Sequence, residues 1–261
     1  MDMKLTILGS GDAFGSGGRM QTSLHLVTDE RQLLIDCGAT TLIAMAQRNL
    51  DPNDISAIVL THLHGDHFSG LIWFLLHAKH VGKRRRPLTI VGPVGTRERL
   101  DVAAEALFPG SALTHTDFAM NFLQHNEIAP LDVDGISISA FQVEHRSGAP
   151  PYALRLEHEG CVVAFSGDTE WTDRLFDAAA LADVFICECF AHEHPTPGHI
   201  AWSTLREKLP KLTAKSLYLT HMGPSMLANK DAINDPRVYF CEDGLIINVT
   251  QPNKVARRTR D

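Results

Sequence analysis

The chain has 261 residues, with 31 acidic against 24 basic side chains and a formal net charge of −7. This balance argues against a protein that coats nucleic acid, because such proteins are normally basic, although it leaves room for a local basic groove. The basic run at 83–86 is interpreted as solvated loop charge, with a nucleic-acid edge as the alternative. Hydrophobic residues make up 44% of the chain, as in ordinary globular proteins, and we expect residues 1–261 to form a single domain.

No stretch of 18 apolar residues occurs, so the sequence predicts no membrane span. The N-terminal stretch MDMKLTILGSGDAFGSGG resembles a strand and a glycine-rich turn, not a signal peptide. The five cysteines are scattered and odd in number, which is typical of reduced, buried thiols. A metal or redox pair at Cys187 and Cys189 is the alternative. We therefore expect a cytoplasmic protein.

Short runs rich in β-branched residues, bounded by Gly, Pro, Asp or Asn, predict strands. They lie at 4–9, 23–28, 32–37, 57–60, 88–92, 136–143, 153–158, 161–167, 184–188, 216–221 and 245–250. Helices are predicted at 40–48, 68–80, 96–108, 172–181 and 203–212. Because hairpins dominate each half and helices follow the strand groups, we predict two sheets packed face to face with helices outside, rather than a doubly wound sheet.

The stretch THLHGDHFSG at 61–70 carries His62, His64, Asp66 and His67 directly after the apolar run AIVL. It connects a predicted strand to a predicted helix, where loops often hold functional residues. Imidazole and carboxylate together suit zinc, manganese or iron. Burying these groups without a metal would be costly, so the pattern predicts a metal site rather than an exposed polar loop.

Three further candidate ligands, His145, Asp168 and His221, each come at the tip of an apolar predicted strand. Taken singly, each is explained equally well as a surface histidine or a turn aspartate. Together with the dense motif HLHGDH, they predict ligands for a second metal ion.

This combination of HLHGDH with His145, SGDT and THM resembles the metallo-β-lactamase superfamily across residues 5–221. The resemblance implies an α/β (α+β) fold, a four-layer αββα sandwich, which agrees with the predicted elements. It also implies two divalent metal ions, with zinc as the first choice and manganese or iron as alternatives.

The resemblance further implies a division of the ligands between the two ions. One ion is held by His62, His64 and His145, the other by Asp66, His67 and His221, and Asp168 bridges them. Two cations about 3.5–4 Å apart lower the pKa of bound water, so a hydroxide bridging the pair is the expected nucleophile. Asp66 could also orient this hydroxide.

Further motifs, LGSGDAFGSGG, LLIDCG, FSGDT, ICE and GHIAW, resemble the ribonuclease Z and cyclic-nucleotide phosphodiesterase branch. In that branch a histidine, oriented by a glutamate, assists at the phosphate and the leaving group, and here His199 and Glu188 match that pair. A histidine of near-neutral pKa suits protonation of a departing alkoxide, while packing of a loop is the alternative role for His199. Arg19, in the glycine-rich turn, is the candidate for binding a phosphate oxygen of the substrate.

The predicted function is metal-dependent hydrolysis of a small-molecule or short, cyclic nucleotide-like phosphodiester. Many bacterial members that mature tRNA carry a long arm between the third histidine ligand and the bridging aspartate. His145 and Asp168 are only 23 positions apart, so the tRNA 3′ end is a less favoured substrate. The alternatives are a lactone, ester or thioester hydrolase of the same fold and, in another class, a non-hydrolytic metal-binding or redox protein. The resemblance also allows a homodimer.

Overall fold

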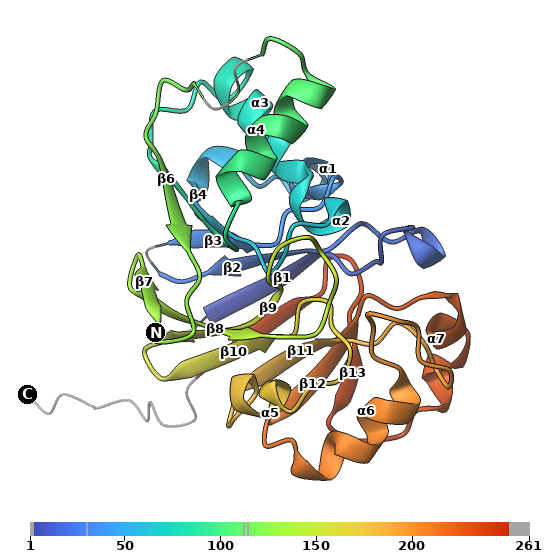
Figure 1. Ribbon diagram of the computed structural model, residues 1–261. Coiled ribbons are helices and arrows are strands. Elements are labelled where there is room, and N and C mark those ends of the chain that lie inside the picture. The colour runs from blue at the N-terminus through green and yellow to red at the C-terminus, as the bar shows by residue number, and fades with distance from the viewer. Residues whose placement is uncertain (1–2, 30, 112, 114, 251–261) are drawn as a thin grey trace, which may run out of the picture.

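The computed structural model describes residues 3–29, 31–111, 113 and 115–250. Its strands form two seven-stranded sheets that pack face to face, with helices on both outer faces (Figure 1). In spatial order, the first sheet consists of β14 (Ile246–Val249), β1 (Met3–Gly9), β2 (Ser23–Val27), β3 (Gln32–Ile35), β4 (Ile55–Val59), β5 (Leu88–Gly92) and β6 (Met120–Gln124). The second consists of β13 (Val238–Phe240), β12 (Ser216–Thr220), β11 (Val184–Glu188), β10 (Cys161–Phe165), β9 (Tyr152–His158), β8 (Ile136–Gln142) and β7 (Leu131–Val133).

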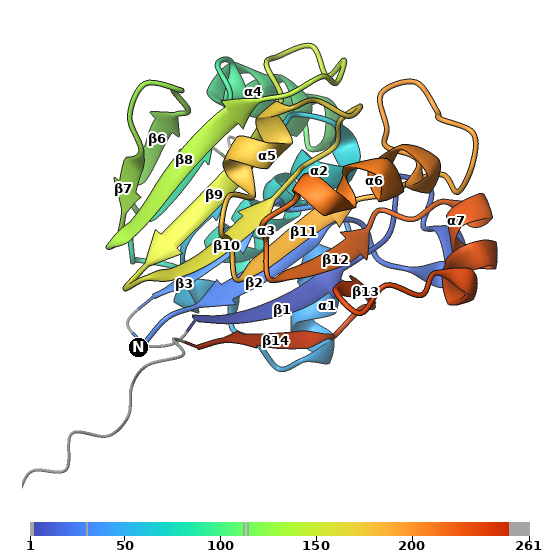
Figure 2. The same ribbon diagram turned by 90° about the horizontal axis from the view of Figure 1, so that it is seen from below.

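The helices divide between the two outer faces, and Figure 2 shows α5 and α6 over the second sheet. Beside the first sheet lie α1 (Thr41–Gln47), α2 (Gly65–Phe68), α3 (Gly70–His80) and α4 (Thr96–Leu107). Beside the second lie α5 (Arg174–Ala178), α6 (Trp202–Lys208) and α7 (Pro224–Asn229). The predicted four-layer αββα sandwich is therefore confirmed.

Strand β4 shows why the central strands are apolar throughout. Ala57 and Val59 point into the core between the sheets, while Ile58 and Leu60 pack with the helices on the outer face. Because both faces of the strand are buried at these positions, the residues there are all apolar and do not alternate between apolar and polar, as they do in a strand with one solvent-exposed face. Strands β3 to β6 run parallel, as do β10 to β13, so their carboxyl ends gather at one edge of the sandwich.

Backbone hydrogen bonds join the two sheets at this edge. The amide of Tyr152 donates to the carbonyl of Thr61 at 3.1 Å, and the amide of His221 donates to that of Ser10 at 3.0 Å. The loops that follow strands of both sheets are thereby held at fixed separations.

The predicted helix at 68–80 is wrong at its start, because the chain forms α2 and α3 with a break at Ser69. Gly70 lies against the backbone of Gly38, where an added Cβ would come within 2.0 Å of the Gly38 carbonyl oxygen. The Gly70 amide also donates to the Cys37 carbonyl. Glycine permits this close approach, which fixes the loop after β3 beside the loop after β4.

Strands β6, β7 and β13 and helix α7 were not predicted. The three strands are short and lie at the outer edges of the sheets, and β6 exposes much of its length. Such edge strands lack the apolar runs that reveal buried strands in a sequence.

The interpretation of the basic run 83–86 as solvated charge is wrong for Arg84, which is buried. Its guanidinium donates to backbone carbonyls, and no carboxylate of the described residues forms an ion pair with it. The acceptors are the carbonyl oxygens of Pro52, Asn53, Ile55, Arg86 and Pro87. Burial lowers the pKa of Arg84 to about 10. Arg84 therefore fixes the entry to β4 and offers no charge to a nucleic acid.

All five cysteines are buried and none forms a disulfide, as the scattered pattern predicted. Among the residues described, each helix is too short or too polar to cross a membrane.

We expect His125 to make folding sensitive to acid. Its Nε2–H donates to the Leu60 carbonyl at 2.9 Å, its Nδ1 has no hydrogen-bond partner, and burial lowers its pKa to about 4. Below an unfolded pKa near 6.5, the unfolded chain takes up a proton that the folded chain refuses. Stability should therefore fall by up to about 1.4 kcal/mol per pH unit as the pH drops from 6.5 toward 4. Chemical denaturation of wild type and His125→Gln at pH 7 and pH 5 measures this, and an equal loss in both proteins would contradict it.

Candidate dinuclear metal site

The loop after β4 carries the first ligands because the strand ends at the shared edge of the sandwich. His62 and His64 follow the strand, and Asp66 and His67 lie in the single turn of α2. His62, Asp66 and His67 are buried, and His64 is half-buried. The loop therefore turns four ligand side chains toward one place.

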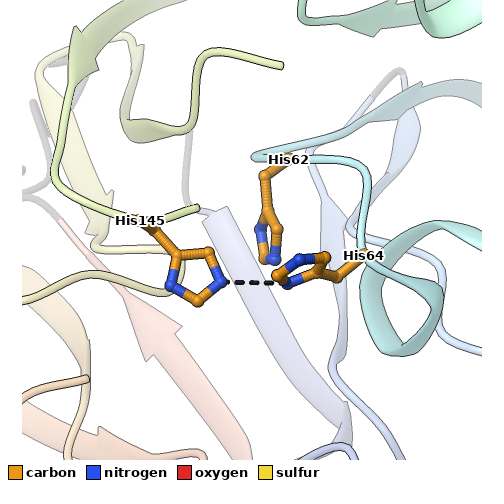
Figure 3. Close-up of side chains that lie close together, drawn as sticks. All are labelled: His62, His64 and His145. Carbon is orange, nitrogen blue, oxygen red and sulfur yellow. Dashed lines mark hydrogen bonds between the residues drawn. The ribbon is translucent and has the colours of Figure 1, made fainter. Parts of the chain in front are cut away.

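Three histidines form the first group, and Figure 3 shows their rings converging from two loops. The ligand atoms of His62, His64 and His145 all lie within 4.8 Å of one another. The Nε2 of His145 lies 3.0 Å from Nδ1 of His64. The Nδ1–H of His145 donates to the Gly198 carbonyl at 2.8 Å, which fixes the ring and turns Nε2 toward the group.

Asp66, His67, Asp168 and His221 form the second group, again with ligand atoms within 4.8 Å of one another. The Nε2 of His67 lies 3.2 Å from Oδ1 of Asp168 and 3.3 Å from Oδ2 of Asp66. The Nδ1 of His221 lies 3.4 Å from Oδ1 of Asp168. His221 has a left-handed backbone with φ of 55°, a conformation that costs a non-glycine residue about 1–3 kcal/mol.

Asp168 lies between the two groups and turns one oxygen toward each. Its Oδ1 faces His67 and His221, while its Oδ2 lies 3.8 Å from Nε2 of His62 and 3.9 Å from Nε2 of His145. A carboxylate in this position has the geometry to bridge two cations.

Burial disfavours the charged forms of the ligands, and opposite charges on neighbouring residues counteract this effect. Burial disfavours a charged Asp168, but His221 and His67 hold the pKa of its carboxyl well below its usual value. Burial likewise opposes a charged His67, yet Asp168, Asp36 and Asp66 raise the pKa of that imidazole well above its usual value. Three carboxylates around one imidazole require positive charge at this point.

The residues fit divalent metal ions. The Nε2 of His62 is buried without any hydrogen-bond partner. The Nε2 of His67 is also buried and makes no well-aligned hydrogen bond, although two carboxylate oxygens lie 3.2 and 3.3 Å from it. A buried imidazole nitrogen normally has a partner, and a metal ion would supply one. Nitrogen and carboxylate donors in two adjacent groups are the set that zinc, manganese and iron accept.

Asp36 supports the metal site, although no predicted site residue included it. Its Oδ2 accepts a hydrogen bond of 2.6 Å from Nδ1 of His67, and its Oδ1 accepts one of 2.7 Å from the Thr61 amide. Asp36 is buried in a left-handed conformation with φ of 57°. The motif LLIDCG carried the signal, since it places an aspartate at a strand tip like the other ligands.

Glu188 and His199 form a pair beside the metal ligands. The Nδ1–H of His199 donates to Oε1 of Glu188 at 3.0 Å, and the amides of Thr169 and Ile200 donate to the same carboxylate. Burial raises the pKa of Glu188 to about 7. Burial lowers the pKa of His199, but the hydrogen bond to Glu188 and the negative charges of Glu188, Asp168 and Asp66 together raise it to about 9. The ring centroids of His199 and His145 lie 5.2 Å apart.

A cavity of about 750 Å³ opens over this site. His64, His145 and His199 form part of its lining. Three charged side chains, Glu144, Arg146 and Glu170, also line it. Arg19 is not part of this lining, because its guanidinium turns back along its own loop toward Gly17. The assignment of Arg19 to the substrate stays a prediction.

Comparison with known proteins identifies the family. A sequence profile described as Anti-Pycsar protein Apyc1 matches residues 3–246. The chain belongs to this family. Ribonuclease Z from Lachnospira eligens is 25% identical over 290 residues, which covers 91% of this chain and 93% of that protein. Ribonuclease Z from Mycobacterium bovis is 28% identical over 193 residues, which covers 70% and 69% of the two chains.

A solved structure is also similar to the present protein. The metallo-β-lactamase fold protein YhfI from Bacillus subtilis superposes with a TM-score of 0.77 at 19% identity, over 95% of this chain and 100% of that one. This structural match confirms the metallo-β-lactamase fold. The sequence matches to ribonuclease Z confirm the predicted resemblance and the class of metal-dependent hydrolase.

Replacing Asp36 with Asn should weaken metal binding. The variant loses the negative charge that holds and polarises His67, and such supporting carboxylates change metal affinity by about 10–100-fold. Competition against a chromophoric chelator measures zinc affinity in the wild type and the variant. Asp183→Asn removes a carboxylate that caps the Val162 amide far from the ligands, and it should leave zinc affinity unchanged. Equal affinity in Asp36→Asn and wild type would contradict the role of Asp36.

Proposed function

We propose that this protein hydrolyses a small phosphodiester, with a cyclic nucleotide as the first candidate, at a pair of divalent metal ions. The observation that carries the proposal is the Asp168 carboxylate, which turns one oxygen toward each of two ligand groups beside His199. Zinc is the first candidate metal, and manganese and iron are the alternatives. When bound, the pair would lower the pKa of a water between them and supply a hydroxide nucleophile.

The chain's own residues have distinct tasks in this proposal. His62, His64 and His145 would hold one ion, and Asp66, His67 and His221 the other, with Asp168 shared. Asp66, in the first turn of α2, would also accept a hydrogen bond from the attacking water and orient it.

His199 would protonate the leaving oxygen. Cleavage of the P–O bond leaves an alkoxide, which needs a proton before it departs into water. The Nδ1–H of His199 donates to Glu188, which leaves Nε2 as the ring nitrogen that can carry the proton for the leaving oxygen. Glu188 would act as a positioning residue, because its carboxylate is buried and fixed by two backbone amides.

The short segment between His145 and Asp168 favours a small substrate. The 22 residues between His145 and Asp168 contain β9 and β10, joined by the tight turn at Glu159 and Gly160. No long arm for gripping an RNA can emerge there. A net charge of −7 also opposes a large polyanion, so we favour a small substrate although related proteins are named ribonuclease Z. A cytoplasmic location and a homodimer remain part of the proposal.

His199→Ala should reduce turnover of a 3′,5′-cyclic nucleotide by about 100-fold or more, the range expected for loss of a general acid. The loss should be smaller for bis(p-nitrophenyl) phosphate, because p-nitrophenolate departs without a proton. His64→Ala should remove turnover of both substrates. Steady-state kinetics with protein loaded with zinc, manganese or iron measures these effects.

His194→Ala is the matched control, since this exposed histidine lies on the same loop and should leave turnover unchanged. An equal loss on both substrates in His199→Ala would contradict the role of His199 in protonation. Hydrolysis of a lactone or thioester, with no phosphodiester turnover under any of the three metals, would overturn the proposed function.

Precursor tRNA should be a poor substrate. Because no arm projects between His145 and Asp168, we expect a weak grip on the tRNA body and cleavage at least about 100-fold slower than that of a cyclic nucleotide at equal enzyme concentration. A gel assay with a labelled precursor measures it, and comparable rates would show that another surface grips the RNA.

A further inference from the structure

Arg146 is a charged side chain in the cavity that the proposed reaction has not yet used. It follows His145 directly and lines the same cavity of about 750 Å³ as His64, His145 and His199. The side chain is exposed. No carboxylate lies within 4.0 Å of its guanidinium in the portion of the chain that the structure describes. Arg146 is therefore the permanent cation of this lining, and its hydrogen-bond donors face solvent.

The loop that carries Arg146 is held in place on both sides. The Val143 amide donates to the Pro151 carbonyl at 3.1 Å, and the Glu144 amide donates to Oγ1 of Thr169 at 3.1 Å. The buried hydroxyl of Ser147 donates to the Ala149 carbonyl at 2.8 Å. A fixed backbone limits the entropy lost when the side chain orders around a ligand.

The chemistry of the group points to an anionic oxygen. A guanidinium presents parallel N–H donors that match the oxygens of a phosphate, and it keeps its charge at any physiological pH. The adjoining carboxylate of Glu170 is already held by the Gly198 amide at 2.8 Å. Glu170 thus keeps one wall of the cavity acidic, while Arg146 places positive charge beside His145.

We propose that Arg146 binds a non-bridging phosphate oxygen of the substrate and thereby selects anionic phosphodiesters over neutral esters. This inference rests on the proposed function, because it assigns the substrate side of the same site. It differs from the prediction for Arg19, which lies outside the cavity lining.

The test compares Arg146→Ala and Arg146→Lys with Arg99→Ala. Arg99 is a matched control, because it is also exposed and lies against Gly148, yet it lines a separate groove. Each alanine variant removes one positive charge near the site. Two readouts are used for each protein: the kinetics of bis(p-nitrophenyl) phosphate, and calorimetric binding of inorganic phosphate to zinc-loaded protein freed of excess zinc.

We expect Arg146→Ala to raise KM about tenfold with kcat within about twofold, and to weaken phosphate binding about tenfold. Such a split is typical of a residue that binds substrate and transition state equally. Arg146→Lys should recover part of both losses, and Arg99→Ala should stay within about twofold of wild type. A KM and a phosphate affinity within twofold of wild type in Arg146→Ala would overturn the inference, as would equal effects in Arg99→Ala.

The phosphate measurement separates this inference from the proposed function. If the wild type hydrolyses no phosphodiester but Arg146→Ala alone weakens phosphate binding, the oxyanion site stands and the reaction is another one. If phosphate binding is the same in both proteins, Arg146 has no such role whichever substrate is turned over. Thermal melting of each variant confirms that an exposed substitution leaves the fold intact.

Discussion

The concentration of ionisable groups at one edge of the sandwich is the constraint on which the rest of this structure depends. Asp36, Asp66 and Asp168 surround His67, and all four are buried. Negative charges buried together repel strongly, and each also loses its hydration. Only positive charge between them makes the arrangement stable, whether it is a proton on His67 or a divalent ion. The site is therefore a place where cations bind because the fold has already brought the carboxylates together.

The fold can hold such a group because its stability comes from elsewhere. Three apolar cores, one between the sheets and one under each helix layer, bury most of the strand residues. The parallel strands deliver their carboxyl ends to a single edge, so ligands from β4, β10 and β12 meet without any long loop. The left-handed backbones of Asp36 and His221 add strain at this edge, which rigid strands and inter-sheet hydrogen bonds can sustain.

The sequence predicts the buried central strands of this protein better than its exposed edge strands and short helices. β5 and β11 have the predicted bounds because both faces of each strand are apolar. β6, β7, β13 and α7 lack that signal, since few of their side chains are buried. The same contrast holds at the site. Dense polar residues after an apolar strand indicate ligands. Asp36 has the weaker signal of a single aspartate at a strand tip, and its contact with His67 is evident only in the fold, as is the place of Arg146 in the cavity lining.

The charge of the cavity reconciles an acidic protein with the anionic substrate that we propose for it. The net charge of −7 acts at long range and is screened by salt beyond about 10 Å. Within the cavity, the local groups decide binding, and there Arg146 is positive, as the metal ions would be when bound, while Glu144 and Glu170 are negative. Under the proposed function, a single phosphate would place its charge beside Arg146 and the bound metal ions. A chain of phosphates would bring further negative charge into a cavity that also contains Glu144 and Glu170, and repulsion would cancel part of its gain. The proposed preference for a small phosphodiester thus has the same physical basis as the binding of cations between the buried aspartates.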